Sequence, residues 1–569
     1  MKRFTLIFLS FILTVILTPK SMLLASEVIS DPELKNGVTF ENIKKQSQGS
    51  VNDMLIFSQA DEVYDKAGHR YKLVSLNPKV NSWFLLEVQK QGKRAEIYHL
   101  ENSDPSRWQL SLLIVDDFVS LEAMAPDGMT FECKPWDGEL ERAGQLELPF
   151  VEICNQILSV RNKVVGNKTT KEAVSDFLRD KIVFGDAIVN LIKGAFYQDA
   201  FMVTTDTVIA LNSPNNKNFL PSAKTGYVSQ MRSDLSFEII NNQNEMIAGS
   251  WYEVKNAPGV YFSQIQPKMI RDDILRSNGA NQLDSIEKNA DVYLFGFDLS
   301  KFALGYSLGT DHPRLGWSSR PSDRHAGSGP DGFDKSDPII RNGALNPKLL
   351  PKVVASFTGG FKREHGAWRF GDKATYNYGN HYGFIQNGVT LSRLWPGLAT
   401  LYVDTNDDVK METWVPKDYQ AYQSIKFARQ NGVPLLENGK PGDAVMSWGD
   451  GNWSGSADAD LRTVRAGSCL LQEGQKKYLV YAYFSSATPS SMARVFQAYQ
   501  CNYAMLLDMN SQDLTYSAIY LKEDDNLSAK HIVKGMINSD IKHRNGDHIP
   551  RFIFAPDNRD FFYLTKKEE

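Results

Sequence analysis

The chain has 569 residues, a formal net charge of -4 and no low-complexity tract. This length allows about two or three domains, because single hydrophobic cores stop growing at roughly 250–300 residues. The small net charge and the lack of a basic stripe with interleaved aromatic residues exclude nucleic acid as an expected partner. The apolar content excludes a disordered chain.

Residues 1–26 predict a signal peptide. Lys2 and Arg3 precede an apolar run from Phe4 to Leu17, and small residues follow up to Ser26. The run is shorter than the roughly 20 residues that a membrane-spanning helix needs, and an uncleaved anchor is the alternative. We therefore expect a secreted or periplasmic protein with no transmembrane segment after cleavage.

Residues 50–160 predict a β-rich N-terminal domain, and residues 169–288 a helical segment followed by short strands. Runs of β-prone residues cover 71–74, 83–88 and 108–115. Thr169 and Glu172 have the spacing of a capping box. Apolar residues then recur near the 3.6-residue period as far as Ile192, which predicts an amphipathic helix.

The second half is predicted to form one domain, residues 290–565. An alternating strand begins at Val292, and a connection rich in Gly, Ser, Pro and Asp runs from Gly309 to Asn346. A loop of this length is either functional or a solvated insertion, and both alternatives stay open.

Four cysteines fall as one pair in each half of the chain. An even count in an exported protein favours disulfides, and we predict Cys133–Cys154 and Cys469–Cys501 because each pair then lies within one domain. Four buried free thiols are the alternative. No CxxC or clustered Cys/His spacing occurs, so no metal site is predicted.

Several segments of the second half occur in a distinctive order. A β-prone run leads into Thr358-Gly359-Gly360-Phe361, a hairpin signal follows at Asn387-Gly388, and Pro434-Leu435-Leu436 comes next. Arg462-Thr463-Val464-Arg465 then leads into a strand, and a last strand ends in Leu507-Asp508-Met509-Asn510. This order resembles the phosphodiester glycosidase domain family, of the N-acetylglucosamine-1-phosphodiester alpha-N-acetylglucosaminidase-like type, as a divergent branch over roughly residues 290–565.

Two departures from the family pattern stand in this sequence. Thr358 occupies the place of the family's Asn, and Met509-Asn510-Ser511 replaces the glycines of its Leu-Asp-Gly-Gly-Gly-Ser loop. The resemblance implies hydrolysis of a sugar–phosphate diester at the glycosidic side, in a mixed α/β domain. With the first half, the expected fold class is α+β: an N-terminal β-rich region with a helical segment, then this glycosidase-like domain.

The resemblance also implies a binding site for a saccharide or sugar-phosphate ligand. Thr358, Gly359 and Gly360 form a turn whose backbone N–H groups can cradle an anionic oxygen. Arg462 or Arg465 would bind phosphate through the planar guanidinium, and which of the two corresponds to the family's arginine stays open. Asn510 either hydrogen-bonds a sugar hydroxyl or holds its own turn.

Cleavage at an anomeric carbon normally requires carboxylates. Asp508, at the end of a strand, is the predicted catalytic carboxylate, and an aspartate that caps the following turn is the alternative. Glu364 and His365, just after the Gly359-Gly360 turn, complete the predicted catalytic set, since an imidazole suits proton transfer. A structural or exposed histidine is the alternative.

The sequence therefore predicts an exported hydrolase-like protein that acts on a glycosyl phosphodiester or a related envelope saccharide. The alternative is a non-catalytic saccharide-binding or envelope-associated protein that retains the fold, so enzymatic activity itself stays open. No cofactor is expected, although Asp458 and Asp460 leave a divalent cation open. The sequence makes no prediction of oligomeric state.

Overall fold

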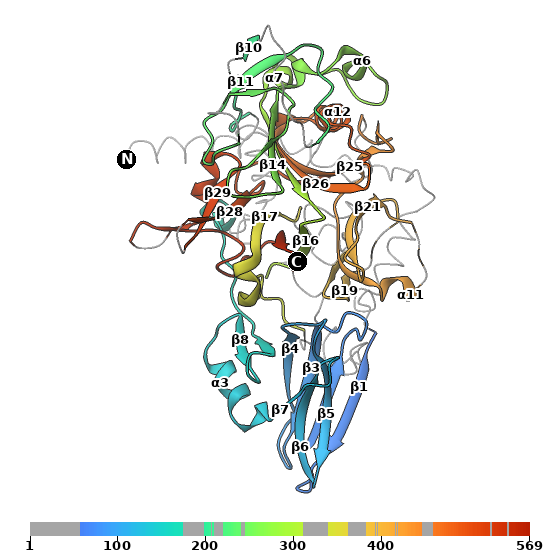
Figure 1. Cartoon of the computed structure of the whole chain (residues 1–569), viewed down its shortest axis with the longest axis vertical. Helices are drawn as coiled ribbons and strands as arrows, with labels where there is room; N and C mark the ends of the chain where they lie inside the picture. Colours follow the sequence, from blue (N-terminus) through green and yellow to red (C-terminus); the bar gives the residue numbers. More distant parts are fainter. Residues whose placement is uncertain are drawn as a thin grey trace, which may run out of the picture.

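The computed structural model describes residues 57–174, 199–205, 207–209, 220–240, 245–310, 339–361, 383–392, 394, 396–415, 417, 419–446, 459–523, 526–542 and 545–568. It consists of a small β-sandwich at one end of the long axis and a larger body of stacked sheets (Figure 1). The predicted signal peptide, residues 1–26, and most of the long connection after Gly309 lie outside the described residues.

The α+β prediction was wrong, because the described residues are mostly β, with 43% in strands against 13% in helices. The long helix of the second half, α12 (Pro489–Ala498), has only 10 residues. Helix α7 (Ser285–Asn289) has a complete capping box and still ends after 5 residues. A capping box marks where a helix starts but not how far it runs. The expected mixed α/β domain came from the family resemblance, and the described part of residues 290–565 instead forms antiparallel sheets with short helices.

The sandwich buries its own hydrophobic core between two antiparallel sheets. The β-prone runs predicted at 71–74, 83–88 and 108–115 are confirmed as β2, β3 and β5. The six-stranded sheet has the order β1 (Gln59–Tyr64), β2 (Arg70–Ser75), β3 (Trp83–Gln89), β4 (Glu96–Asn102), β9 (Leu158–Arg161), β8 (Phe150–Ile153), and the three-stranded sheet has the order β5 (Gln109–Val115), β6 (Phe118–Met124), β7 (Thr130–Cys133).

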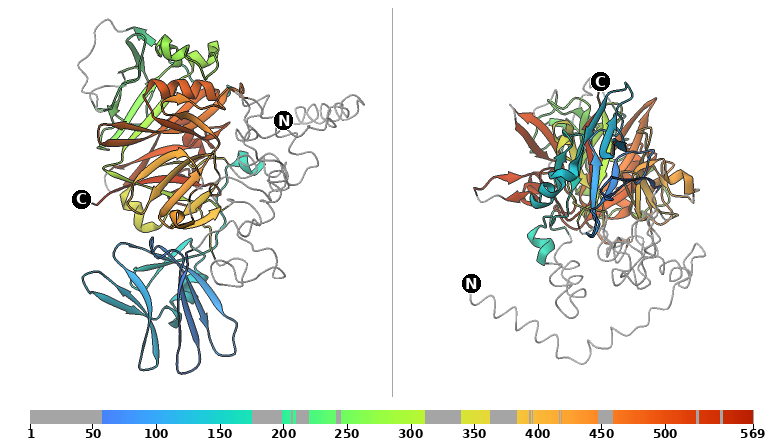
Figure 2. Two further views of the ribbon diagram at one scale, coloured as in Figure 1. Left: turned by 90° about the vertical axis from the view of Figure 1, so that its right-hand side faces the viewer. Right: turned by 90° about the horizontal axis from the view of Figure 1, so that it is seen from below.

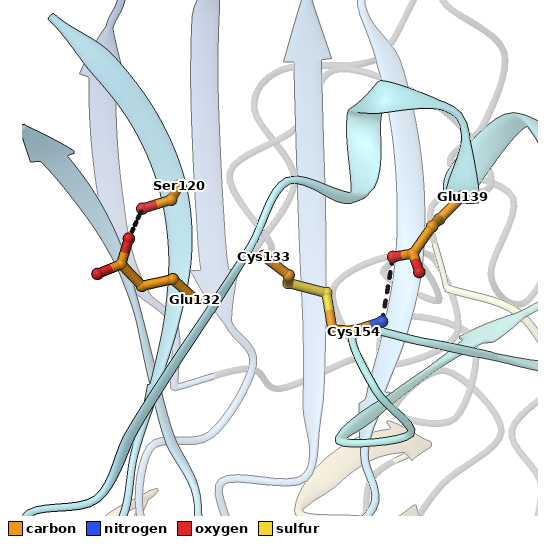
Figure 3. Close-up of a disulfide and its surroundings, with 5 residues drawn as sticks. All are labelled: Ser120, Glu132, Cys133, Glu139 and Cys154. Atoms are coloured by element: carbon orange, nitrogen blue, oxygen red, sulfur yellow. Dashed lines mark hydrogen bonds between the residues drawn. A yellow bond between two sulfur atoms is a disulfide. The ribbon is translucent and has the colours of Figure 1, made fainter.

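A disulfide joins the end of β7 to the turn after β8, which confirms the predicted pair Cys133–Cys154 (Figure 3). Between the two cysteines lie η1 (Pro135–Asp137) and α3 (Glu139–Gln145). The Glu139 carboxylate accepts a hydrogen bond of 3.1 Å from the backbone N–H of Cys154. The disulfide and this bond therefore hold α3 against the sandwich.

A helix begins at Thr170, as the capping box predicted. The Glu172 N–H donates to Thr169 Oγ1 at 3.3 Å, and Glu172 Oε2 accepts from the Thr169 N–H at 3.2 Å. Residues 175–198, which carry the rest of the predicted periodicity, lie outside the described residues. The short strands and helices that follow are β10 (Thr207–Ile209), β11 (Ser229–Arg232), β12 (Glu245–Ile247), η2 (Pro267–Met269) and α6 (Asp272–Leu275).

An eight-stranded antiparallel sheet, here called the central sheet, crosses the body. Its middle strands are apolar because the sheet is covered on both faces: Phe357 packs on Tyr481 on one face, and Met492 of α12 lies against Gly467 on the other. The order is β13 (Tyr252–Glu253), β14 (Val260–Ile265), β15 (Val292–Asp298), β26 (Lys476–Ala487), β25 (Thr463–Glu473), β27 (Tyr503–Met509), β23 (Pro434–Glu437), β24 (Lys440–Pro441).

Two five-stranded antiparallel sheets complete the body (Figure 2). One has the order β16 (Phe302–Ser307), β32 (Phe561–Lys566), β17 (Val353–Thr358), β28 (Ser517–Glu523), β29 (Asn526–His531), and the other β19 (Val389–Ser392), β18 (Phe384–Gln386), β22 (Ile425–Gln430), β20 (Ala399–Asp404), β21 (Val409–Thr413). The remaining elements are η3 (Pro347–Lys352), α11 (Tyr419–Tyr422), η4 (Lys534–Ser539), β30 (Ile541–Lys542) and β31 (His548–Ile549).

In the second half of the chain, the sequence correctly predicted one hairpin turn and one disulfide. Asn387 and Gly388 form the turn of the β18–β19 hairpin, both with positive φ, 49° and 79°. The second predicted disulfide is also confirmed: Cys469 of β25 is bonded to Cys501, which follows α12. Among the described residues, no helix has the length and apolar character needed to cross a membrane.

Candidate functional site

Two of the predicted segments meet at the ends of β17 and β27. Asn431 joins them: its Nδ2 donates to Leu507 O at 2.6 Å, and its Oδ1 accepts from the Phe361 N–H at 3.1 Å. The Gly359-Gly360 turn and the Asp508 loop are therefore neighbours. Asn431 itself was not predicted, although it follows β22 directly in the sequence.

The Gly359-Gly360 turn is packed too closely to be a free anion cradle. The Gly359 N–H donates to Asp560 O at 2.9 Å. A Cβ on Gly360, which has φ +135°, would lie 2.7 Å from Asn431 Oδ1. Glycine is required here because protein atoms approach the backbone, and the Thr358 hydroxyl beside it is buried without a hydrogen-bond partner among the described residues.

Asp508 is a buried carboxyl group at the end of β27, with 4% of its surface exposed. Its Oδ2 accepts from Arg559 Nη1 at 2.5 Å, and its Oδ1 from the Met509 N–H at 2.8 Å. Burial raises the pKa of Asp508 to about 6, against the lowering effect of Arg559. Asp508 can therefore hold a proton close to neutral pH.

Arg559 connects Asp508 to a second carboxylate. Its Nε donates to Glu172, in the first turn of the helix that begins at Thr170. Glu172 also accepts from Arg551 Nη2 at 3.1 Å, and Arg551 Nε donates to Asp557 at 2.7 Å. Two carboxyl groups thus share one guanidinium inside a buried network of alternating charge.

The two predicted phosphate-binding arginines are held elsewhere. Arg462 binds Asp199 at 2.7 Å and also contacts Asp284. Arg465 donates to Ala487 O and Leu461 O, each at 2.8 Å, and burial lowers its pKa to about 9.

Arg465 and Asp508 do not converge on one pocket. Arg465 lies two residues before Gly467 on β25, so both point to the face of the central sheet that α12 covers. Asp508 instead binds Arg559, next to β32 in the sheet on the opposite face. The structure brings Thr358, Gly359, Gly360 and Asp508 together but leaves Arg462 and Arg465 outside this group.

Asn510 has φ +82°, and its backbone N–H donates to Val464 O of β25 at 2.9 Å. Glu364, His365 and Asp458 lie outside the described residues. Asp460 accepts from Asn281 Nδ2 at 2.9 Å, and the described part of the chain contains no group of three metal-binding side chains.

Sequence reasoning missed the residues that surround Asp508. Glu172 was noted only as a helix cap, and Arg559 was not noted at all. One signal was present: Asp557-Asn558-Arg559-Asp560 places three charges directly before the buried apolar strand β32. Charged residues so close to a core strand are buried and must be paired.

Comparisons with known proteins leave the family open. No family model and no curated protein matches the chain. A solved structure described as a hypothetical protein from Synechocystis is similar at 9% sequence identity and a TM-score of 0.24, over 90% of this chain and 100% of that chain. A likeness at this TM-score carries no argument about fold or function, so the relationship to phosphodiester glycosidases stays a prediction.

Proposed function

We propose that the protein is an exported hydrolase of glycosyl phosphodiesters or a related envelope saccharide, with Asp508 and Glu172 as its two carboxyl groups. One observation carries the proposal: both bind the same guanidinium, that of Arg559, and burial raises the pKa of Asp508 to about 6. A carboxylic acid that keeps its proton near neutrality, beside a second carboxyl group, is the arrangement that glycoside hydrolysis uses.

Each group has a role in this proposal. Asp508 donates its proton to the leaving phosphate oxygen, and Glu172 accepts a proton from the attacking water. A phosphate leaving group is already acidic, so an acid with a pKa of about 6 is sufficient. Arg559 and Arg551 hold the two carboxyl groups in place through their ion pairs.

The two disulfides support export, because structural disulfides persist in oxidising compartments. Together with the predicted signal peptide, residues 1–26, they support an activity outside the cytoplasm, in the periplasm or the external medium. The substrate would then be a saccharide of the cell envelope.

A second candidate is a non-catalytic saccharide-binding protein that retains this architecture. The N–H groups of Gly359 and Phe361 favour it, since both donate to protein acceptors rather than into a cradle. The 4% exposure of Asp508 favours it as well, because a catalytic acid must reach its substrate.

The test is a turnover assay of the mature chain on a panel of sugar-1-phosphodiesters. We expect product from the wild type, and a loss of about 100-fold or more in kcat for Asp508→Asn and for Glu172→Gln. Asp298→Asn is the matched control: Asp298 is also buried and accepts from the Ser300 N–H and hydroxyl, and no interaction among the described residues joins it to Arg551 or Arg559. Saccharide binding by the wild type and by Asp508→Asn, without turnover by either, would establish the second candidate instead.

A further inference from the structure

A large open cavity lies between the sandwich and the body, away from Asp508. Its volume is about 580 Å³, within the range of about 300–1,000 Å³ typical of ligand pockets. The sandwich contributes the loop from Ser103 to Trp108, the start of β7 and the turn from Asn155 to Ile157, and the body contributes η3.

Trp108 forms an aromatic wall of this cavity and is held in place. Its carbonyl accepts from Asn81 Nδ2 at 2.7 Å and from Asn102 Nδ2 at 2.8 Å. Its N–H donates to Asp104 O at 3.0 Å, so the whole 104–108 turn is fixed by the sandwich. The ring is only partly buried, against the sandwich core. A rigid, accessible indole of this kind loses little entropy when a ligand stacks on it.

The cavity wall carries an excess of positive charge. Arg107, Lys348 and Lys352 line it, and the Arg107 guanidinium lies 5.1 Å from the centre of the Trp108 ring. The one carboxylate in the lining, Asp104, accepts from Ser106 Oγ at 2.6 Å and from the Arg107 N–H at 3.1 Å within its own turn. Lys352 is paired with Glu568, so an anionic ligand would meet the cations of Arg107 and Lys348 and an aromatic face.

The cavity continues inward. A smaller space of about 150 Å³ adjoins it and shares Ser103, Lys348 and Leu349 in its lining. Asn346 and Asn387 line this inner part beside the Glu101 carboxylate, which accepts a hydrogen bond from each of their amides. The two spaces together form a groove with an open, cationic end and a polar, enclosed end.

From these features we infer that the groove between the sandwich and the body binds an anionic polysaccharide. A sugar ring stacks on Trp108, and phosphate or carboxylate groups of the polymer bind Arg107 and Lys348. This inference does not rest on the proposed hydrolase, because none of these residues contacts Asp508 or Arg559 among the interactions described above.

Binding of the full mature chain to three soluble polymers tests the inference. The probes are poly(glycerol phosphate), polygalacturonate and neutral dextran, measured by calorimetry at low and moderate salt. We expect binding to at least one of the two anionic polymers, weakened by salt, and none to dextran. Which of the two binds identifies phosphate or carboxylate as the preferred group.

Variants locate the site. Trp108→Ala should weaken binding about tenfold, and Arg107→Ala/Lys348→Ala should weaken it and reduce its salt dependence. Tyr64→Ala and Lys542→Ala are matched controls, since both side chains are exposed and neither lines the cavity, and both should bind like the wild type. Asp508→Asn should also bind like the wild type, which separates this site from the proposed active site.

Failure of both anionic polymers to bind would overturn the inference, as would undiminished binding by Trp108→Ala. Binding of dextran as tight as that of the anionic polymers would also overturn the inference, because the inference depends on selectivity for negative charge. Far-ultraviolet circular dichroism of each variant distinguishes loss of binding from loss of the fold.

Discussion

Asp508 shows how burial and pairing compete at a single residue. Its ion pair with Arg559 favours the charged form, and its burial favours the neutral form. The effect of burial is the larger of the two, since the pKa of Asp508 rises from 3.8 to about 6. The folded protein therefore binds this proton more tightly than the unfolded chain does.

This difference makes stability depend on pH in a defined direction. Below about pH 4 the carboxyl group is protonated in both states, and its contribution to stability is complete; as pH rises through 6 that contribution is lost. A shift of this size corresponds to about 3 kcal/mol. We expect the free energy of unfolding of the wild type, minus that of Asp508→Asn, to fall by this amount between pH 4 and pH 7.

Urea unfolding of both proteins at several pH values measures the difference. Subtraction removes the other titrating groups, which the two proteins share. The loss of the ion pair to Arg559 adds an offset between the two curves, but the shape of the difference reports Asp508. Curves that stay parallel from pH 4 to pH 7 would show that Asp508 is ionised throughout this range in the folded protein.

At the scale of elements, the disulfide Cys469–Cys501 ties the central sheet to the helix that covers it. It joins Cys469 of β25 to Cys501, which follows α12, and the two cysteines are 32 residues apart in the sequence. Both cysteines are buried, with 0% and 1% of their surfaces exposed. Closing a loop of this length in the unfolded chain corresponds to roughly 3–4 kcal/mol.

We therefore expect Cys469→Ala/Cys501→Ala to lower the free energy of unfolding of the body by about 3 kcal/mol. Urea titration followed by circular dichroism checks this. The matched control is Cys133→Ala/Cys154→Ala, which removes the other disulfide from the separate core of the sandwich and should leave the transition of the body in place. A loss below about 1 kcal/mol in the first variant would mean that packing of α12 alone fixes this region.

Sequence patterns predicted elements whose causes are local. Asn387-Gly388 specifies its hairpin turn, and Thr169 with Glu172 specifies a helix start, because the relevant contacts span two to four residues. The fold class depends on contacts that are not local, since β15 pairs with β26 and β17 with β32 across roughly 190–210 residues of sequence. The candidate site was found only in part: Asp508 was predicted, but its partners Arg559 and Glu172 lie 51 and more than 300 residues away, beyond any spacing rule.

At the scale of the whole molecule, buried polar residues join the sandwich to the body. Arg161 of β9 donates to Glu101 at 2.5 Å within the sandwich and to Asn342 of the body at 3.1 Å. Its guanidinium lies 4.5 Å from the Trp83 ring centre and is fully buried. Glu101 in turn accepts from Asn346 of the body at 2.8 Å. Both members of this ion pair therefore also bind residues across the junction.

Removing the cation should loosen this attachment as well as lower stability. In Arg161→Met the apolar stem is kept, but Glu101 stays buried without its cation, which typically costs about 3–5 kcal/mol. Because Asn342 also loses its donor, the sandwich should unfold separately from the body. We expect one calorimetric transition of the wild type to become two, and limited proteolysis to cleave the variant faster near residues 339–346.

An exposed ion pair of the same sandwich gives the control. Lys66 lies 3.5 Å from Asp117 with 83% of its side chain exposed, so Lys66→Met should change stability by less than about 1 kcal/mol and leave the number of transitions unchanged. If Arg161→Met also unfolds like the wild type, the apolar contacts and remaining amide bonds are enough to hold the two parts together. The groove beside Trp108 would then keep its shape without the ion pair, since its two walls come from these same parts.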